Sequence, residues 1–262
     1  MSAILELQGV SMSFGGLKAV DNLSFSVNEN EIVSIIGPNG SGKTTTFNVI
    51  SGLYEPDSGD ILLKGESVAG MRPDQVHDKG ISRTFQSLRL FSNMSVLENV
   101  LVGMHSVTDA GLLASMLRLP KVRREEKAMR ERAQEILDMF PGRFSGPRQQ
   151  QPAFSLSYAN RRRLEIARAL ASNPTLLMLD EPVAGMNPME SHEVMEQIKI
   201  LREKGYTIVM IEHDMHVVEG VSDRVIAMDH GVKIAEGSYS DVANDPQVVE
   251  AYLGKRAAEA TA

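Results

Sequence analysis

The chain has 262 residues, 42% of them hydrophobic, which is enough to form a core for one α/β domain or for a domain with an added lobe. Its formal net charge of -7 argues against bulk binding to nucleic acid, and the absence of cysteine excludes a disulfide framework and favours a reducing compartment. No stretch approaches the roughly 18 apolar residues of a membrane span, so we expect a soluble chain that could act at a membrane only by docking on a spanning protein.

Strand signals dominate the first 36 residues. Short runs alternate apolar and polar residues, as in LSFSV at 23–27, and the denser apolar run at 32–36 predicts a buried strand. A helical pattern follows over residues 44–53, then a turn at 55–59 and a further strand over 61–63. This part of the chain is therefore predicted to be rich in β-structure.

Helix signals take over from about residue 92 to residue 140, and include a highly charged helix near 121–140. The stretch PGRFSGPRQQQP at 141–152 is typical of a connector. After it we expect helices over 159–172, 189–204 and 215–222, strands over 176–179 and 207–211, and a hairpin around 229–231. Alternating strands and helices predict a parallel sheet, and residues 255–262 are expected to form a frayed tail.

The segment GPNGSGKT at residues 37–44 matches the P-loop pattern and stands where that motif works, after a buried strand and at the start of a helix. Its glycines let backbone N–H groups wrap phosphates, Lys43 can meet the β and γ oxygens, and Thr44 can ligate Mg²⁺. An ordinary glycine-rich turn is the alternative, and the strand–loop–helix setting argues against it.

A P-loop enzyme also needs a carboxylate at the end of a strand to hold the metal. Asp180 follows the four apolar residues 176–179 and is the candidate. Glu181 beside it could position or deprotonate an attacking water, or could simply cap the turn before Pro182.

Two more polar residues close expected strands. Gln86 follows residues 81–85 and His213 follows residues 208–212. Ligands of open α/β sheets gather at the carboxyl ends of the strands, so both are candidates for the same site.

Three consecutive arginines, Arg161–Arg163, stand near the start of the helix expected at 159–172. Cations are unfavourable at a helix N-terminus. Either they lie on a solvated face, or they form an anion site with Ser157 and the helix N-terminus.

The order of these residues resembles the nucleotide-binding subunits of ABC transporters over essentially the whole chain. In that family's terms residues 37–45 are the Walker A loop, Gln86 the Q-loop glutamine, 156–160 the signature loop, 176–180 Walker B, 183–187 the D-loop and His213 the switch histidine. Residues 14–20, 111–119 and 184–188 look like the larger ATPase of branched-chain amino acid importers, whereas 161–170 would also fit lipopolysaccharide export.

The resemblance implies a set of site residues. Those expected to bind ATP are Phe14, Gly37, Asn39, Gly40, Ser41, Gly42, Lys43, Thr44 and Thr45, together with Ser157 and Ala159, which would act on the nucleotide of a partner subunit. Those expected to be catalytic are Glu181, His213 and Gln86, and those expected at Mg²⁺ are Thr44, Gln86 and Asp180. Since Ser157 would face a phosphate, the arginines are then expected at the surface of the lobe or at the partner contact.

Two residues depart from the family's pattern. Ala159 replaces a signature glycine that approaches the γ-phosphate, and Asn187 replaces the usual aspartate of the D-loop. Alanine keeps its backbone N–H but its Cβ limits close approach, so we expect a working enzyme that is slowed.

The resemblance also implies an α/β fold, with a P-loop ATPase core, an N-terminal antiparallel β subdomain and an inserted helical subdomain. We expect residues 1–88 and 171–254 to form the core, 89–170 the helical subdomain and 255–262 a tail. The implied partners are a second ATPase subunit of the same type or a paralogue, transmembrane permease subunits and, indirectly, a substrate-binding protein, but no nucleic acid. The implied location is peripheral, on the cytoplasmic face of the inner membrane. A soluble ABC ATPase acting on DNA or ribosomes and a small P-loop kinase are the competing classes.

Overall fold

The computed structural model describes residues 3–104 and 120–253 of the chain. By its contacts the chain forms two compact units: unit 1 comprises Met1–Arg83, Thr175–Pro182 and Ile198–Ala262, and unit 2 comprises Thr84–Pro174 and Val183–Gln197. The stretch 111–119, which resembles an importer insertion, and the predicted tail at 255–262 lie outside the described residues.

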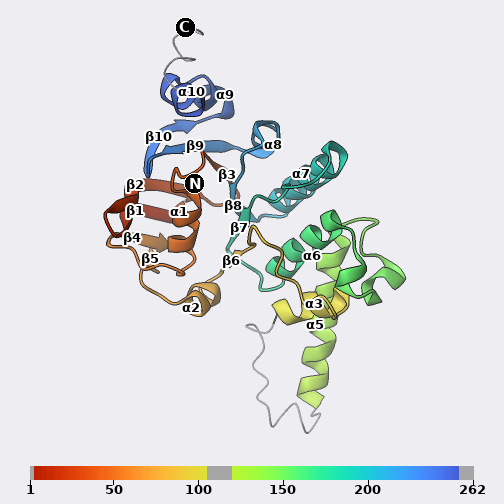
Figure 1. The fold of residues 1–262 in the computed structure, drawn as a ribbon. Coiled ribbons are helices and arrows are strands. Elements are labelled where there is room, and N and C mark those ends of the chain that lie inside the picture. The colour runs from red at the N-terminus through yellow and green to blue at the C-terminus, as the bar shows by residue number, and fades with distance from the viewer. Residues whose placement is uncertain (1–2, 105–119, 254–262) are drawn as a thin grey trace. The chain divides into compact units, whose positions relative to one another are not determined.

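Unit 1 contains a six-stranded sheet in the order β10-β9-β3-β8-β7-β6 (Figure 1). Neighbouring strands from β9 to β6 run parallel, and only β10 is antiparallel to its neighbour. The strands are β3 (Ile32–Ile36), β6 (Ile81–Arg83), β7 (Leu176–Asp180), β8 (Thr207–Ile211), β9 (Arg224–Asp229) and β10 (Val232–Gly237). Every residue of β3, β7 and β8 is buried, as expected for central parallel strands with both faces covered. The predicted parallel sheet is confirmed.

A second, antiparallel sheet in unit 1 has the order β2-β1-β4-β5. It consists of β1 (Ala3–Phe14), β2 (Leu17–Asn28), β4 (Ser58–Leu63) and β5 (Glu66–Ser67). Its inward residues share one apolar core with a face of the parallel sheet, from Leu5 and Phe25 to Met178 and Ile226. The predicted N-terminal antiparallel subdomain is therefore confirmed.

The helices of unit 1 are α1 (Lys43–Ile50), α2 (Pro73–Asp78), α8 (Met215–Val221), α9 (Tyr239–Ala243) and α10 (Pro246–Leu253). Val218, Val242 and Val248 from the last three pack with Ile36, Val225 and Ala227 in a smaller apolar cluster. The predicted hairpin is confirmed, since His230 and Gly231 join β9 to β10 with positive φ angles of 45° and 83°.

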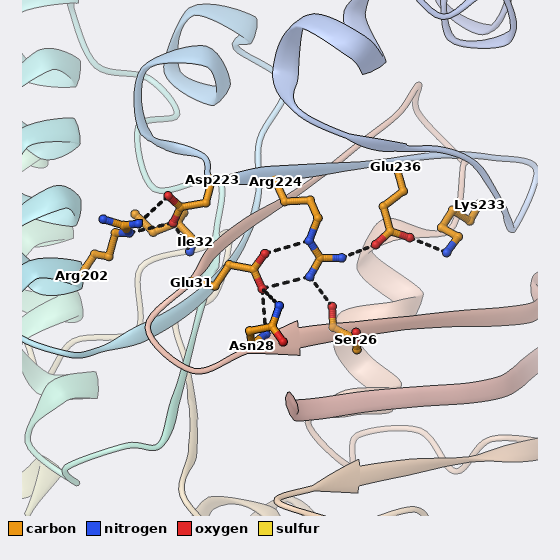
Figure 2. A network of polar contacts seen from close by, with 9 residues as sticks. All are labelled: Ser26, Asn28, Glu31, Ile32, Arg202, Asp223, Arg224, Lys233 and Glu236. Atoms are coloured by element: carbon orange, nitrogen blue, oxygen red, sulfur yellow. Dashed lines mark hydrogen bonds and ion pairs between the residues drawn. The ribbon is translucent and has the colours of Figure 1, made fainter. Parts of the chain in front are cut away.

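A polar network ties β2, β3, β9 and β10 of unit 1 together (Figure 2). The guanidinium of Arg224 donates from Nε and Nη2 to the two carboxylate oxygens of Glu31, at 2.8 and 2.9 Å, and from Nη2 to the carbonyl oxygen of Ser26 at 2.6 Å. Asp223 accepts two bonds of 2.7 Å from Arg202 and a third from the backbone N–H of Ile32. The network therefore ties the amino ends of β3 and β9 to the carboxyl ends of β2 and β10.

Unit 2 is helical. It contains α3 (Val96–Gly103), α5 (Pro120–Asp138), α6 (Tyr158–Leu170) and the short 3₁₀ turns η2 (Gly146–Gln150) and η3 (Ala153–Ser155). Helix α7 (Pro188–Glu203) begins in unit 2 and ends in unit 1. α3 begins with a capping box in which Ser95 and Glu98 bond each other's backbone N–H groups.

Two predicted elements end earlier than expected. Helix α1 stops at Ile50 because Ser51 takes the C-cap position and Gly52 follows with φ 71°. Strand β6 stops at Arg83, and the remaining residues 84 and 85 of the expected strand belong to unit 2.

Candidate functional site

The loop between β3 and α1 has the backbone that a phosphate cradle needs. Gly40 and Gly42 have φ angles of 83° and 101°, and a Cβ added at Gly42 would lie 2.4 Å from the carbonyl oxygen of Ala19. Gly42 is also the N-cap of α1 and contributes no side-chain cap, so the first N–H groups of the helix can donate to a ligand. Thr44 is exposed in the first turn of the same helix.

The side chain of Lys43 folds back onto this loop. Its Nζ donates to the carbonyl oxygens of Gly37 and Pro38, at 2.6 and 2.9 Å, and lies 3.3 Å from Ser41 Oγ. Burial lowers the pKa of Lys43, while the nearby carboxylates of Glu181 and Asp180 act in the opposite direction. The ammonium group of Lys43 therefore lies close enough to both predicted carboxylates to interact with them electrostatically.

The two carboxylates stand at the carboxyl end of β7. Asp180, the last residue of the strand, pairs with Ile211 of β8 and is 4% exposed. Glu181 has a left-handed backbone, with φ 48°, and its N–H donates to the carbonyl oxygen of Ile211 at 3.0 Å. A non-glycine residue held in this conformation at a strand end is a common feature of functional sites.

His213 lies at the end of the neighbouring strand, β8. Its Nδ1 is 3.8 Å from Glu181 Oε1 and 3.9 Å from Glu212 Oε2, and its side chain is largely exposed. Glu212 is fully buried and accepts hydrogen bonds from the backbone N–H groups of His213 and Asp214. The structure thus brings the predicted pair Glu181 and His213 together, and Glu212, which the sequence did not single out, holds the turn that presents the histidine.

Arg83 is a second residue that sequence reasoning missed. Its Nη2 donates to Asp180 Oδ2 at 2.8 Å, and its Nη1 donates to Asn48 Oδ1 at 2.7 Å and to Ser51 Oγ at 3.1 Å. The side chains of Arg83 and Asp180 are 6% and 5% exposed. An arginine in a short buried strand was the available signal, because a buried cation requires a partner. Arg83 links the carboxylate of Asp180, at the end of β7, to the helix that starts with Lys43.

Phe14, which the family resemblance predicts to bind ATP, is 43% exposed at the end of β1. Its ring meets that of Tyr54 edge to face, with centroids 5.2 Å apart. Tyr54, which the sequence did not single out, is 38% exposed, so this pair offers an aromatic surface in unit 1.

Unit 2 holds the remaining predicted site residues. Ser157 is the N-cap of α6, and its Oγ accepts from the N–H of Asn160 at 3.4 Å. Ala159 lies in the first turn of the helix and is 2% exposed, whereas Gln86 is exposed.

The expected surface position is wrong for two of the three arginines. Arg162 and Arg163 are 0% and 1% exposed. Arg162 is neutralised by Glu165, with an N–O distance of 2.8 Å, and Arg163 by Glu193, at 2.7 Å. Spacing along the helix does not show that these two arginines are buried, and so a charged face was mistaken for a solvated one.

Within residues 3–104 and 120–253, no group of three or more metal-ligating side chains of the His, Asp or Glu type occurs. In the same ranges no helix has the length and apolar character needed to cross a membrane.

Comparison with known proteins decides the family. Residues 20–184 match the family model of the ABC transporter, and residues 232–258 match that of the branched-chain amino acid ATP-binding cassette transporter. The chain belongs to the ATP-binding subunits of ABC transporters. It is accordingly an ATP-binding cassette, an ATPase, and a component of an ABC transporter complex.

Similar proteins cover nearly the full chain. The high-affinity branched-chain amino acid transport ATP-binding protein LivG of Salmonella typhimurium is 44% identical over 253 residues, which are 96% of this chain and 98% of LivG. BraF of Pseudomonas aeruginosa, of the same description, is 41% identical over 258 residues, again 96% and 98% of the two chains.

Solved structures agree with the fold. The crystal structure of the ADP conformation of the ATP-binding cassette MJ1267 matches with a TM-score of 0.84 and 35% identity, over 97% of this chain and 100% of that one. The dimeric cassette MJ0796 matches with a TM-score of 0.74 and 27% identity, over 90% and 98%. The predicted α/β cassette fold is confirmed.

Proposed function

We propose that this chain hydrolyses ATP with Mg²⁺ to power uptake of branched-chain or related amino acids, as one of two ATPase subunits on the cytoplasmic face of a membrane. The observation that supports hydrolysis best is the meeting of Glu181, His213 and Lys43 at the carboxyl ends of β7, β8 and β3. The substrate class is supported by relatives named for branched-chain amino acid transport and by the match at residues 232–258.

Each residue has a role that follows from its place. Lys43 would exchange the carbonyl oxygens of Gly37 and Pro38 for β and γ phosphate oxygens, and the N–H groups at the start of α1 would donate to the same phosphates. Glu181 would take a proton from the attacking water, with His213 orienting the water or the γ-phosphate.

The residues present fit a magnesium ion. Thr44 is exposed in the first turn of α1, beside the cradle, and Asp180 offers a carboxylate at the end of β7, two strands away from β3 in the same sheet. With Gln86, which the family resemblance assigns to the metal, these residues would hold Mg²⁺. Bound there, the ion would neutralise charge on the phosphates during transfer.

A complete site requires a second subunit in this proposal. Ser157 and Ala159 lie at the N-terminus of α6, which can donate to an anion, and they would face the nucleotide of a partner. A dimeric cassette among the similar structures supports this arrangement. Permease subunits, and through them a substrate-binding protein, complete the proposed assembly.

The variant Glu181→Gln tests the proposal, because it keeps the size of the side chain and removes the base. ATP should still bind and should accumulate between two chains, so a dimer should appear by gel filtration with saturating ATP and Mg²⁺ while turnover stops. Glu219→Gln, the same change at an exposed position of α8, is the control and should behave as wild type. A Glu181→Gln protein that stays monomeric and hydrolyses ATP normally would contradict both the dimer and the role of the glutamate.

The transported substrate needs a separate test. Cells that lack this chain should lose uptake of labelled leucine, and wild-type protein but not Glu181→Gln should restore it. Uptake of leucine that does not depend on the chain would leave the ATPase assignment intact and remove the amino acid assignment.

A further inference from the structure

The signature helix α6 carries a fully buried ion pair that bonds to the backbone around Gln86. The guanidinium of Arg162 donates from Nη1 to the carbonyl oxygen of Phe85 at 2.6 Å and from Nη2 to that of Gln86 at 2.8 Å. The same Nη1 lies 2.8 Å from Glu165 Oε2, one turn along the helix. One buried side chain thus donates hydrogen bonds to two successive backbone carbonyl groups.

Glu165 completes the attachment at the other end of the segment. Its Oε1 accepts from the backbone N–H of Arg89 at 3.2 Å, and the side chain is 1% exposed. The guanidinium of Arg89 in turn lies 3.9 Å from the centre of the Phe85 ring. Residues 85–89 are therefore held to α6 at both ends, and all of these contacts lie within unit 2.

Such a pair is costly unless its hydrogen bonds are well made. Two ions lose their hydration on burial, and only good geometry with further bonds offsets that loss. Here the further acceptors and donor are backbone groups of a loop without regular structure of its own. The buried pair thus gives an otherwise irregular segment a fixed position on a rigid helix.

We propose that Arg162 and Glu165 are positioning residues that fix the backbone of Gln86 to α6, so that Gln86 and the helix cap Ser157 move as one piece. The inference rests on the proposed roles of Gln86 at the chain's own nucleotide and of Ser157 at the partner's.

A double-mutant cycle in the full chain tests whether Arg162 acts through Gln86. Arg162→Gln should lower kcat about 10- to 100-fold, because small misplacements of a catalytic group have effects of that size, while KM for ATP stays within about twofold. In a Gln86→Ala background, Arg162→Gln should cause little further loss, since residues acting as one unit are not additive. Losses that simply multiply would overturn the proposal.

Arg163→Gln is the matched control. Arg163 is the next residue of α6 and equally buried, but it bonds to Asn160 and Glu193 rather than to residues 85 and 86. Any loss it causes should multiply with that of Gln86→Ala. If Arg163→Gln shows the same non-additivity as Arg162→Gln, the effect is general softening of unit 2 and the specific role of Arg162 fails.

Hydrogen exchange measures how firmly residues 85–89 are held to α6, and it does so independently of ATPase activity. In Glu165→Gln and in Arg162→Lys, which keeps the charge but cannot reach all three acceptors, amides of residues 85–89 should exchange at least about tenfold faster than in wild type. Unchanged exchange there overturns the proposal. If Gln86→Ala alone leaves kcat unchanged, the proposed role of Gln86 is wrong, and exchange still decides whether Arg162 and Glu165 hold the segment.

Discussion

The ion pair between Glu31 and Arg224 should make a large, pH-dependent contribution to the stability of unit 1. Both carboxylate oxygens of Glu31 accept from Arg224, and the Oε2 atom also accepts from the N–H of Asn28 at 2.7 Å (Figure 2). The two side chains are 12% and 19% exposed. In Glu31→Gln one of the two oxygens becomes an NH₂ group that faces donors, so at least one charge-assisted bond is lost.

The expected cost is about 2–3 kcal/mol near neutral pH, since a hydrogen bond to a charged group contributes roughly 1.5–3 kcal/mol and partial exposure limits the desolvation term. For a chain of this size that corresponds to a fall in Tm of roughly 4–12 °C.

The sign of the pH dependence follows from the pKa of Glu31. Burial raises this pKa, but the hydrogen bonds and charge of Arg224 and the bond from Asn28 outweigh it, so the pKa falls below its ordinary value of 4.5. The stabilisation is therefore fully present above pH 4.5 and is lost as the pH falls through the lowered value. The difference between wild type and Glu31→Gln should shrink in the same range.

Urea unfolding followed by circular dichroism at pH 7, 5.5 and 3.5 measures this difference. Glu66→Gln is the matched control, because Glu66 pairs with Lys79 at 2.7 Å but both side chains are exposed. If Glu31→Gln costs no more than the control at pH 7, or if its cost does not shrink at low pH, then the bidentate pair does not stabilise the fold as argued.

Two further predictions concern the nucleotide site. Lys43→Ala should abolish tight ATP binding, because no methyl group replaces a cation at the phosphates, and equilibrium binding of a fluorescent ATP analogue would show the loss. Arg83→Gln leaves the buried carboxylate of Asp180 without its cation, so it should destabilise unit 1 by about 3–5 kcal/mol, and urea unfolding would detect the loss.

The parts of the site that depend on local pattern could be predicted from the sequence. A buried strand, a glycine-rich loop and a helix start are consecutive in the chain, so residues 32–44 specify the cradle without knowledge of distant contacts. Glu181 and His213 could be placed near it because parallel strands share one carboxyl edge, and the structure puts the two side chains 3.8 Å apart.

Partners far apart in sequence could not be predicted in this way. Arg83 meets Asp180 across 97 positions, and Arg162 meets Gln86 across 76. A charge pattern along one helix does not reveal that a loop covers it, so Arg162 and Arg163 resemble a solvated face until their carboxylate and carbonyl partners are known. The local sequence pattern therefore predicted the wrong environment, solvent instead of the interior, for Arg162 and Arg163.

The buried position of Ala159 argues against the expectation that its Cβ limits approach to the γ-phosphate. The residue lies in the first turn of α6 and is 2% exposed. Its backbone φ angle is not positive. Its Cβ is therefore buried rather than presented at the surface of the signature loop. The neighbouring Tyr158 is 45% exposed, and its ring lies 3.6 Å from the place a Cβ would take at Gly185. Ser157 and Tyr158, rather than Ala159, are thus the exposed residues at the signature loop.

We accordingly expect Ala159→Gly to change kcat by less than about threefold, and to lower the free energy of unfolding by about 1 kcal/mol through the helix penalty of glycine. Were the Cβ the obstacle to the γ-phosphate, its removal should instead raise kcat about tenfold, a barrier change of about 1.4 kcal/mol. ATPase rates at several protein concentrations, with Tyr158→Gly for comparison, separate these outcomes. A tenfold gain for Ala159→Gly would mean that the first turn of α6 rearranges on closure and brings the buried Cβ against the nucleotide.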